Sequence, residues 1–173
     1  MEKTEDQIVN KVAGSSLITF DLEEYFQPGE RVLLDISDQL YQGLILKEKD
    51  FREFIKMHDW ASYKGKFVAI FCAADAIVPT WAYMLLAIAL QPHAKHVMFG
   101  TLEELEVDLF RKSLADIQWS RYQDAKVVIK GCSKVNVPVA VYVEATSRLK
   151  PYAASMMFGE PCSTVPLYKR PKI

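Results

Sequence analysis

The chain has 173 residues, of which 50% are apolar and 25% are charged, as is typical of one folded domain and not of a disordered or fibrous protein. The 21 Lys and Arg side chains nearly balance the 22 Asp and Glu side chains, which argues against a nucleic-acid partner. The apolar run 76–90 is shorter than the ~20 residues that span a bilayer, and the polar start of the chain does not resemble a signal peptide. We therefore expect a cytoplasmic protein with no membrane partner and with reduced cysteines.

The region 1–58 predicts two strands and a helix. Residues 17–22 and 31–36 are β-rich runs, separated by a turn at 27–29. Charged and apolar side chains alternate at helical spacing over 47–57, which predicts an amphipathic surface helix.

An internal repeat dominates the rest of the chain. When the sequence is shifted by 59 residues against itself, many aromatic, proline and apolar positions coincide without a gap. The coinciding pairs are Trp60 and Trp119, Tyr63 and Tyr122, Val68 and Val127, Ile70 and Ile129, Pro79 and Pro138, Tyr83 and Tyr142, Leu90 and Leu149, Pro92 and Pro151, and Phe99 and Phe158. This agreement indicates a tandem duplication, with copies at 59–100 and 118–159.

Each copy predicts a strand, a helix and a second strand. The first strands are expected at 67–71 and 126–129, and the second at 96–99 and 155–158. Pro79 and Pro138 are expected to open the two helices, and the apolar spacing over 102–114 predicts a connecting helix. The fold class is therefore α/β: one domain, with a mainly parallel sheet flanked by helices, a duplicated βαβ unit and additional N-terminal strands.

Three cysteines follow predicted strands. Cys72 and Cys132 come after the first strand of each copy, and Cys162 comes after the last strand. In open parallel sheets, ligands bind at the edge where strands end. Three thiolates there would select zinc or an iron–sulfur cluster, so the sequence predicts a metal site. No Cys-x-x-Cys pair supports it, and free cysteines also serve as small buried apolar side chains.

The residues beside these cysteines offer a second chemistry. Hydroxyls, amides and an ammonium group follow the predicted strands, where they could bind a small anion. They belong to Ser133, Lys134, Glu160, Ser163 and Thr164. Alternatively, Cys132 or Cys162 could act as a nucleophile in a thiol-dependent enzyme.

Asp75 lies in an otherwise apolar loop just past Cys72. Its carboxylate could ligate a metal, accept a proton, pair with Lys134 or cap the helix near Pro79. The three histidines at positions 58, 93 and 96 are expected to be ordinary surface residues.

Several segments resemble a family of small bacterial proteins known as a domain of unknown function. These segments are 40–46, 74–84, VIKGCSK at 128–134 and FGEPCSTVPLYK at 158–169, and the resemblance covers nearly the whole chain. It brings no established activity. Members are often encoded near genes for sulfur mobilisation, so the resemblance implies iron–sulfur assembly proteins as partners. We therefore expect a metal- or iron–sulfur-binding accessory protein, with a thiol enzyme, an anion binder or an interaction module without chemistry as alternatives.

Overall fold

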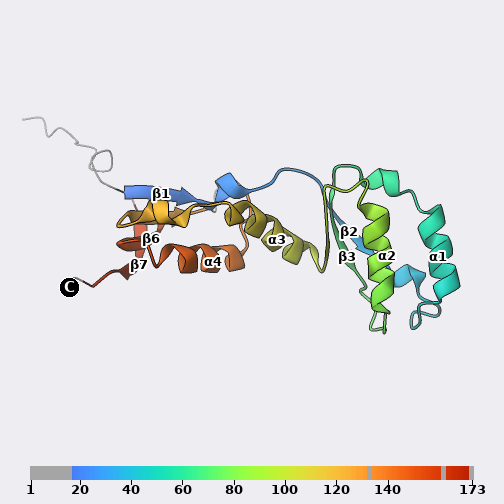
Figure 1. Cartoon of the computed structure of the whole chain (residues 1–173). Helices are drawn as coiled ribbons and strands as arrows, with labels where there is room; N and C mark the ends of the chain where they lie inside the picture. Colours follow the sequence, from blue (N-terminus) through green and yellow to red (C-terminus); the bar gives the residue numbers. More distant parts are fainter. Residues whose placement is uncertain (1–16, 132–133, 161–162, 172–173) are drawn as a thin grey trace, which may run out of the picture. The chain divides into compact units, whose positions relative to one another are not determined.

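The computed structural model describes residues 17–131, 134–160 and 163–171 (Figure 1). The chain divides into two compact units. Unit 1 comprises Met1–Phe26 and Arg111–Ile173, and unit 2 comprises Gln27–Phe110. The described residues form an α/β fold whose mainly parallel sheets are flanked by helices, as the sequence predicts. The single sheet expected from the sequence is replaced by two sheets, one in each unit. The single domain expected from the sequence stays a prediction.

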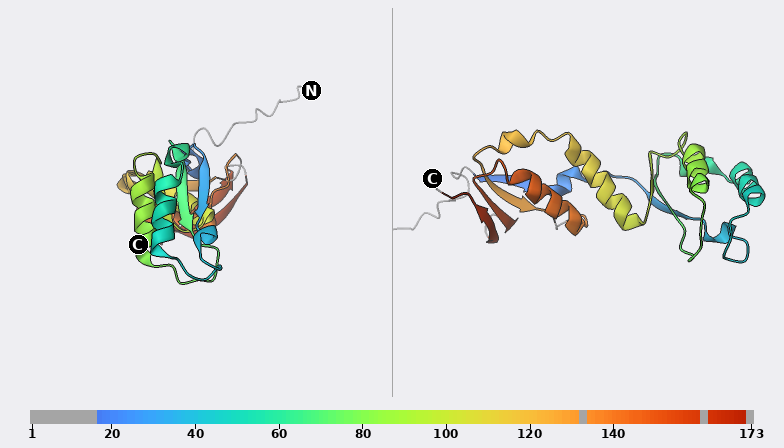
Figure 2. Two further views of the ribbon diagram at one scale, coloured as in Figure 1. Left: turned by 90° about the vertical axis from the view of Figure 1, so that its right-hand side faces the viewer. Right: turned by 60° about the horizontal axis from the view of Figure 1, so that its bottom comes forward.

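Unit 2 contains a three-stranded parallel sheet. Its order is β2 (Arg31–Asp35), β3 (Phe67–Phe71) and β4 (His96–Phe99). The helices α1 (Glu48–Met57) and α2 (Thr80–Leu90) lie side by side over this sheet (Figure 2). Two short 3-10 helices, η2 (Ser37–Gln39) and η3 (Trp60–Tyr63), connect these elements.

The core of unit 2 has two sides because successive side chains of a strand point to opposite faces. Val68 and Ile70 of β3 face a cluster that includes Phe51 of α1 and Leu86 of α2. On the other face, Phe67 and Ala69 pack against Leu105 and Leu109 of the helix α3 (Leu102–Ala115). Burial on both faces explains why β3 reads as an unbroken apolar run.

Unit 1 contains a four-stranded sheet. Its order is β1 (Leu17–Asp21), β5 (Lys126–Lys130), β6 (Ser155–Glu160) and β7 (Ser163–Lys169). The first three strands are parallel, and β7 runs antiparallel to β6. The helix α4 (Val139–Leu149) buries Val141, Ala145 and Leu149, while η1 (Leu22–Tyr25) and η4 (Trp119–Tyr122) are short 3-10 turns.

The duplication expected from the sequence is confirmed in the backbone. The first copy forms β3–α2–β4, and the second forms β5–α4–β6 with the same parallel crossover. Main-chain hydrogen bonds recur at equivalent positions: Gly65 N donates to His93 O at 2.9 Å, and Asp124 N donates to Tyr152 O at 2.9 Å. The aromatic pairs Tyr83–Phe99 and Tyr142–Phe158 also recur, with nearly perpendicular rings at 77° and 85°.

The prolines lie one position earlier than expected. Pro79 and Pro138 occupy the N-cap positions of α2 and α4 with nearly equal extended angles, φ −61° and ψ 138° against φ −60° and ψ 143°. They therefore direct the chain into each helix from outside, since an N-cap residue has a non-helical backbone.

The two N-terminal strands do not pair with each other. β1 joins β5 in unit 1, with Asp21 opposite Lys130, and β2 joins β3 in unit 2, with Asp35 opposite Phe71. Each strand therefore supplies the third parallel strand of one copy. A short signal was present in the sequence, because the segment LITFDL at 17–22 and the segment RVLLDI at 31–36 share the same pattern with Asp at the strand end.

Candidate functional site

The structure places one predicted metal ligand among its described residues. Cys72 follows β3 directly, is half-buried and is a free thiol. Its Sγ lies 3.8 Å from the carbonyl oxygen of Ala74, within the same loop. Cys72 therefore lies at the end of a strand, as the sequence predicts.

The other two cysteines and Ser133 lie outside the described residues, as do any contacts they make. Within the described ranges 17–131, 134–160 and 163–171, no group of three His, Cys, Asp or Glu side chains could hold a metal ion. The metal and iron–sulfur hypothesis therefore stays a prediction.

Of the four roles that the sequence leaves open for Asp75, the helix cap is wrong, because the N-cap residue of α2 is Pro79 and no side-chain hydrogen bond caps this helix. Asp75 is exposed in its loop. The carboxylate that does organise this loop is Asp35, at the end of β2. Its Oδ1 accepts hydrogen bonds from the backbone N–H of Ser37 at 3.0 Å and of Ala73 at 3.1 Å. The Ser37 hydroxyl also donates to it, which together with these amides lowers the pKa of Asp35 below its usual value despite partial desolvation.

The residues predicted to bind an anion are engaged in other ways. The backbone N–H of Lys134 donates to Glu23 Oε1 at 2.6 Å, so a carboxylate already satisfies that amide. Ser163 and Thr164 belong to β7 and pair with Glu160 and Gly159 of β6, so this stretch is a strand and not an anion-binding loop.

The charged groups at this end of unit 1 pair with one another. Glu160 Oε1 lies 3.9 Å from the ammonium of Lys130, which itself lies 3.1 Å from Asp21 Oδ2. Hydrogen bonding to Asp21 raises the pKa of Lys130, so its ammonium is held by carboxylates of the chain. The described part of this edge therefore gives no support to an anion site.

Two of the histidines are not ordinary surface residues. His96 Nε2 lies 2.6 Å from Asp108 Oδ2 of α3. His58 Nε2 lies 3.1 Å from the hydroxyl of Tyr63 and packs among aromatic rings. Both contribute to packing between elements of unit 2.

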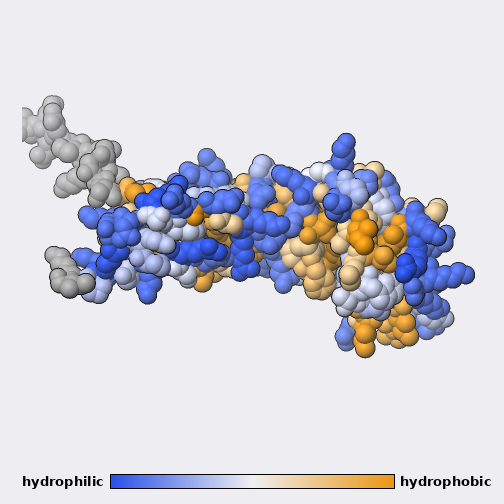
Figure 3. Space-filling model, viewed as in Figure 1, coloured by the Kyte–Doolittle hydropathy of each residue, from blue (hydrophilic) through white to orange (hydrophobic). Residues whose placement is uncertain are grey.

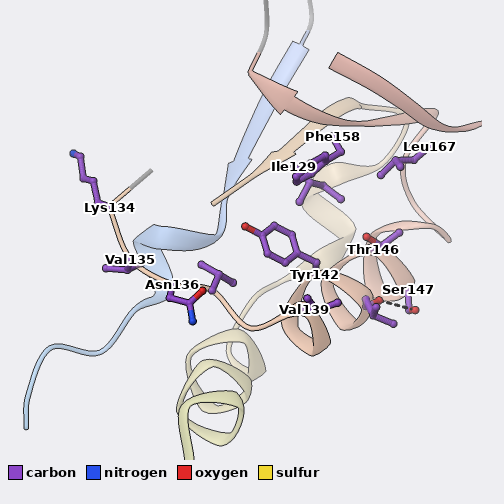
Figure 4. Close-up of a pocket in the computed structure, with 12 residues that line it drawn as sticks. Ile129, Lys134, Val135, Asn136, Val139, Tyr142, Thr146, Ser147, Phe158 and Leu167 are labelled. Atoms are coloured by element: carbon purple, nitrogen blue, oxygen red, sulfur yellow. Dashed lines mark hydrogen bonds between the residues drawn. The ribbon is translucent and has the colours of Figure 1, made fainter. Parts of the chain in front are cut away.

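Unit 1 carries a groove of about 960 Å³ that the sequence did not predict (Figure 4). One wall is the outer face of α4, where Val139 and Val143 are 77% and 61% exposed. The other walls are the strand side chains Ile129 and Phe158, Leu167 of β7, and the loop 134–137. The lining is mostly apolar, as in most small-molecule sites.

Tyr142 is the central polar group of this groove. Figure 4 shows its ring between the loop that carries Val135 and Asn136 and the pair of Ile129 and Phe158. The hydroxyl comes close to the end of β5, because a Cβ placed on Gly131 would lie 3.2 Å from it. The same Cβ would lie 2.8 Å from Leu22 Cβ, and Gly131 has φ +154°, so only glycine fits there.

A sequence signal for the groove existed in α4. Val139 and Val143 are spaced i and i+4, away from the buried stripe of Val141, Ala145 and Leu149. Apolar residues on the solvent-exposed face of an amphipathic helix indicate a surface that binds a ligand or another protein. That signal was hidden by the general apolar character of the repeat.

These features define an α/β protein with a duplicated βαβ unit and an apolar groove beside one crossover helix. The chain belongs to DUF2480, a family of proteins of unknown function, whose model matches residues 6–170. This confirms the family resemblance drawn from the sequence. No curated protein and no solved structure matches the chain. Among the described residues, no helix has the length and apolar character needed to cross a membrane.

Proposed function

We propose that unit 1 is a binding module for an apolar small molecule that carries one oxygen-containing polar group. The observation that supports this function is the groove of about 960 Å³ beside α4, which falls within the size range of small-molecule sites, about 300–1,000 Å³.

The walls favour an apolar body. Val139, Val143 and Leu167 leave much of their side chains exposed to solvent, at 77%, 61% and 49%. Covering this surface with a hydrocarbon or aromatic body is favourable by about 25 cal/mol per Å² of apolar area removed from water.

The polar groups favour a single oxygen function on the ligand. The Tyr142 hydroxyl can donate and accept, and the amide of Asn136 can do both through different atoms. The Tyr142 hydroxyl lies at the end of the groove nearest Gly131. The ligand's polar group is therefore expected beside Tyr142, with its apolar body along α4.

Binding is tested with N-phenyl-1-naphthylamine, whose fluorescence rises in apolar sites, and with dodecan-1-ol and dodecanoate as competitors. The full chain is expected to bind the probe and both competitors are expected to displace it. Val143→Glu places a charge on the apolar wall and is expected to weaken probe binding at least tenfold.

The repeat supplies a matched control. Met84 is the residue of unit 2 that corresponds to Val143, and both are 61% exposed. Met84→Glu should leave probe binding unchanged, and an equal loss in both variants would show non-specific surface adsorption. Tyr142→Phe should weaken dodecan-1-ol several-fold and leave the probe unaffected, since about 1 kcal/mol is typical of one hydrogen bond. Undiminished binding by Val143→Glu contradicts the proposal.

A further inference from the structure

The two units end their sheets differently at equivalent strands. In unit 1, β6 is followed by the antiparallel strand β7, which pairs with it from Ser155 opposite Lys169 to Glu160 opposite Ser163. In unit 2, the equivalent strand β4 is followed by Gly100 and then by α3. Within the described residues, β4 pairs with β3 alone and is an edge strand.

Unit 1 shows how such an edge is covered. At the end of β7, the backbone N–H of Arg170 donates to Ala154 O at 2.8 Å. The guanidinium of Arg170 donates to Tyr152 O at 2.6 Å and to Ala153 O at 3.2 Å, and it pairs with the carboxylate of Asp124. A strand and one arginine thus satisfy the carbonyl groups that follow α4.

In unit 2 the equivalent carbonyl groups belong to His93, Ala94 and Lys95. His93 O accepts one hydrogen bond, from Gly65 N at 2.9 Å, just as Tyr152 O accepts one from Asp124 N in addition to that from Arg170. A groove of about 400 Å³ lies at this place, lined by Ala87, Gln91, Ala94, Lys95, His96 and Val97. Ala94 and Lys95 are the equivalents of Ala153 and Ala154 under the shift of 59 residues. The groove of unit 2 therefore occupies the position where unit 1 holds the end of β7.

Side-chain exposure agrees with a missing strand. Phe99 of β4 is 60% exposed, whereas its equivalent Phe158, beside β7, is 37% exposed. Apolar surface also gathers over the part of unit 2 that carries α2 (Figure 3), where Met84 is 61% exposed. An uncovered edge with apolar surface beside it is a template for strand addition.

We propose that the β4 edge of unit 2 binds an extended segment of a partner protein, antiparallel to β4 and patterned like β7. The segment carries an arginine at the position of Arg170, and its guanidinium donates to the carbonyl oxygens of His93 and Ala94. Gly65 stands where unit 1 has Asp124, so the arginine is recognised by main-chain carbonyls and without a carboxylate. This site is independent of the groove in unit 1.

The test uses a fluorescein-labelled peptide with the sequence of residues 163–171, titrated against the full chain and followed by fluorescence anisotropy. Saturable binding is expected, with hydrogen-exchange protection of the amides of 97–99. A peptide with Arg170→Ala is expected to bind at least tenfold more weakly, because charge-assisted hydrogen bonds to two carbonyls are lost.

Protein variants assign the site. Ala87 is exposed on α2 and lines the groove, so Ala87→Arg should fill the groove, repel the peptide's arginine and weaken binding at least tenfold. Ile88→Arg adds the same side chain at the neighbouring helix position, which does not line the groove, and should bind the peptide as the wild type does.

Three outcomes overturn the proposal. Unchanged binding by Ala87→Arg means that the peptide displaces β7 in unit 1. If the Arg170→Ala peptide binds as tightly as the original peptide, the arginine does not contribute by donating hydrogen bonds to the carbonyl groups. Self-association of the chain in sedimentation, abolished by Ala87→Arg, means that a second copy and not a partner segment covers the edge.

Discussion

At the scale of single residues, carboxylates at strand ends organise the loops that follow the sheets. Asp35 accepts the amide of Ala73, from the loop after β3. In unit 1, Asp21 accepts the amide of Glu23, and Glu23 in turn accepts the amide of Lys134, from the loop after β5. Such bonds fix loop backbone that would otherwise be left without partners. The position and shape of both loops thus depend on short acidic side chains.

Asp35→Asn tests this role through pH. The pKa of Asp35 is lower in the folded chain than the ordinary 3.8, so the ionised carboxylate stabilises the fold fully above pH 3.8, and this contribution is lost as the pH falls through the lower folded value. We expect Asp35→Asn to lower the free energy of unfolding at pH 7 by about 0.5–1 kcal/mol, as for a typical capping carboxylate. Urea titrations of wild type and variant should converge below pH 3.8.

Asp75→Asn is the matched control for that measurement, because Asp75 lies in the same loop and is exposed. It should leave the free energy of unfolding at pH 7 unchanged. A loss at Asp75 as large as that at Asp35 would contradict the role assigned to Asp35.

At the scale of elements, the strand β7 completes unit 1 in two ways. It covers the edge of β6, and its Leu167 forms one wall of the groove beside α4. Arg170 holds the end of this strand through the carbonyls of Tyr152 and Ala153. The integrity of the groove therefore depends on an arginine outside it.

Arg170→Gln tests this dependence. A glutamine keeps polarity but loses the charge and the planar group of donors, so we expect β7 to open more often. The amides of 164–169 should exchange at least tenfold faster with deuterium, which corresponds to about 1.4 kcal/mol. Lys169→Gln is the control, because Lys169 is exposed and should leave the exchange rates unchanged. Unchanged exchange in Arg170→Gln would contradict this role.

The sequence predicted most helices and strands but not how the strands pair. Apolar periodicity and the prolines at 79 and 138 are local signals, and the elements they predict are confirmed within a residue or two. The choice of β5 as the partner of β1 is a long-range contact, which the shared pattern of 17–22 and 31–36 does not determine by itself. No strand was predicted at 163–169, and Pro166 within this segment is tolerated because β7 is an edge strand.

The candidate site was less accessible to sequence reasoning than the fold. The location of Cys72 at a strand end was correct, but the groove depends on which apolar side chains of α4 stay uncovered. In an apolar repeat, Val139 and Val143 look like core residues until the packing of the helix is known. Solvent exposure, and not residue type, distinguishes them.

At the scale of the whole molecule, the thiolate hypothesis is a separate proposal with its own measurement. It expects near-stoichiometric zinc, or iron with acid-labile sulfide, in wild-type protein purified without oxygen, and loss of the metal in Cys132→Ser. Elemental analysis and sulfide determination check both samples. Wild-type protein without metal would contradict the hypothesis, and retention of metal in Cys132→Ser would exclude Cys132 as a ligand.

The pairing of β1 and β2 with different sheets also determines the order in which the sheets can close during synthesis. Leu33 of β2 pairs with Ala69, whereas Thr19 of β1 pairs with Val128. All three strands of unit 2 are therefore synthesised before β5, the strand with which β1 pairs. The strand β1 precedes β2 in the chain but finds its partner later, and because 17–22 and 31–36 share a pattern, we expect β1 to compete with β2 for the edge of β3 until β5 is available.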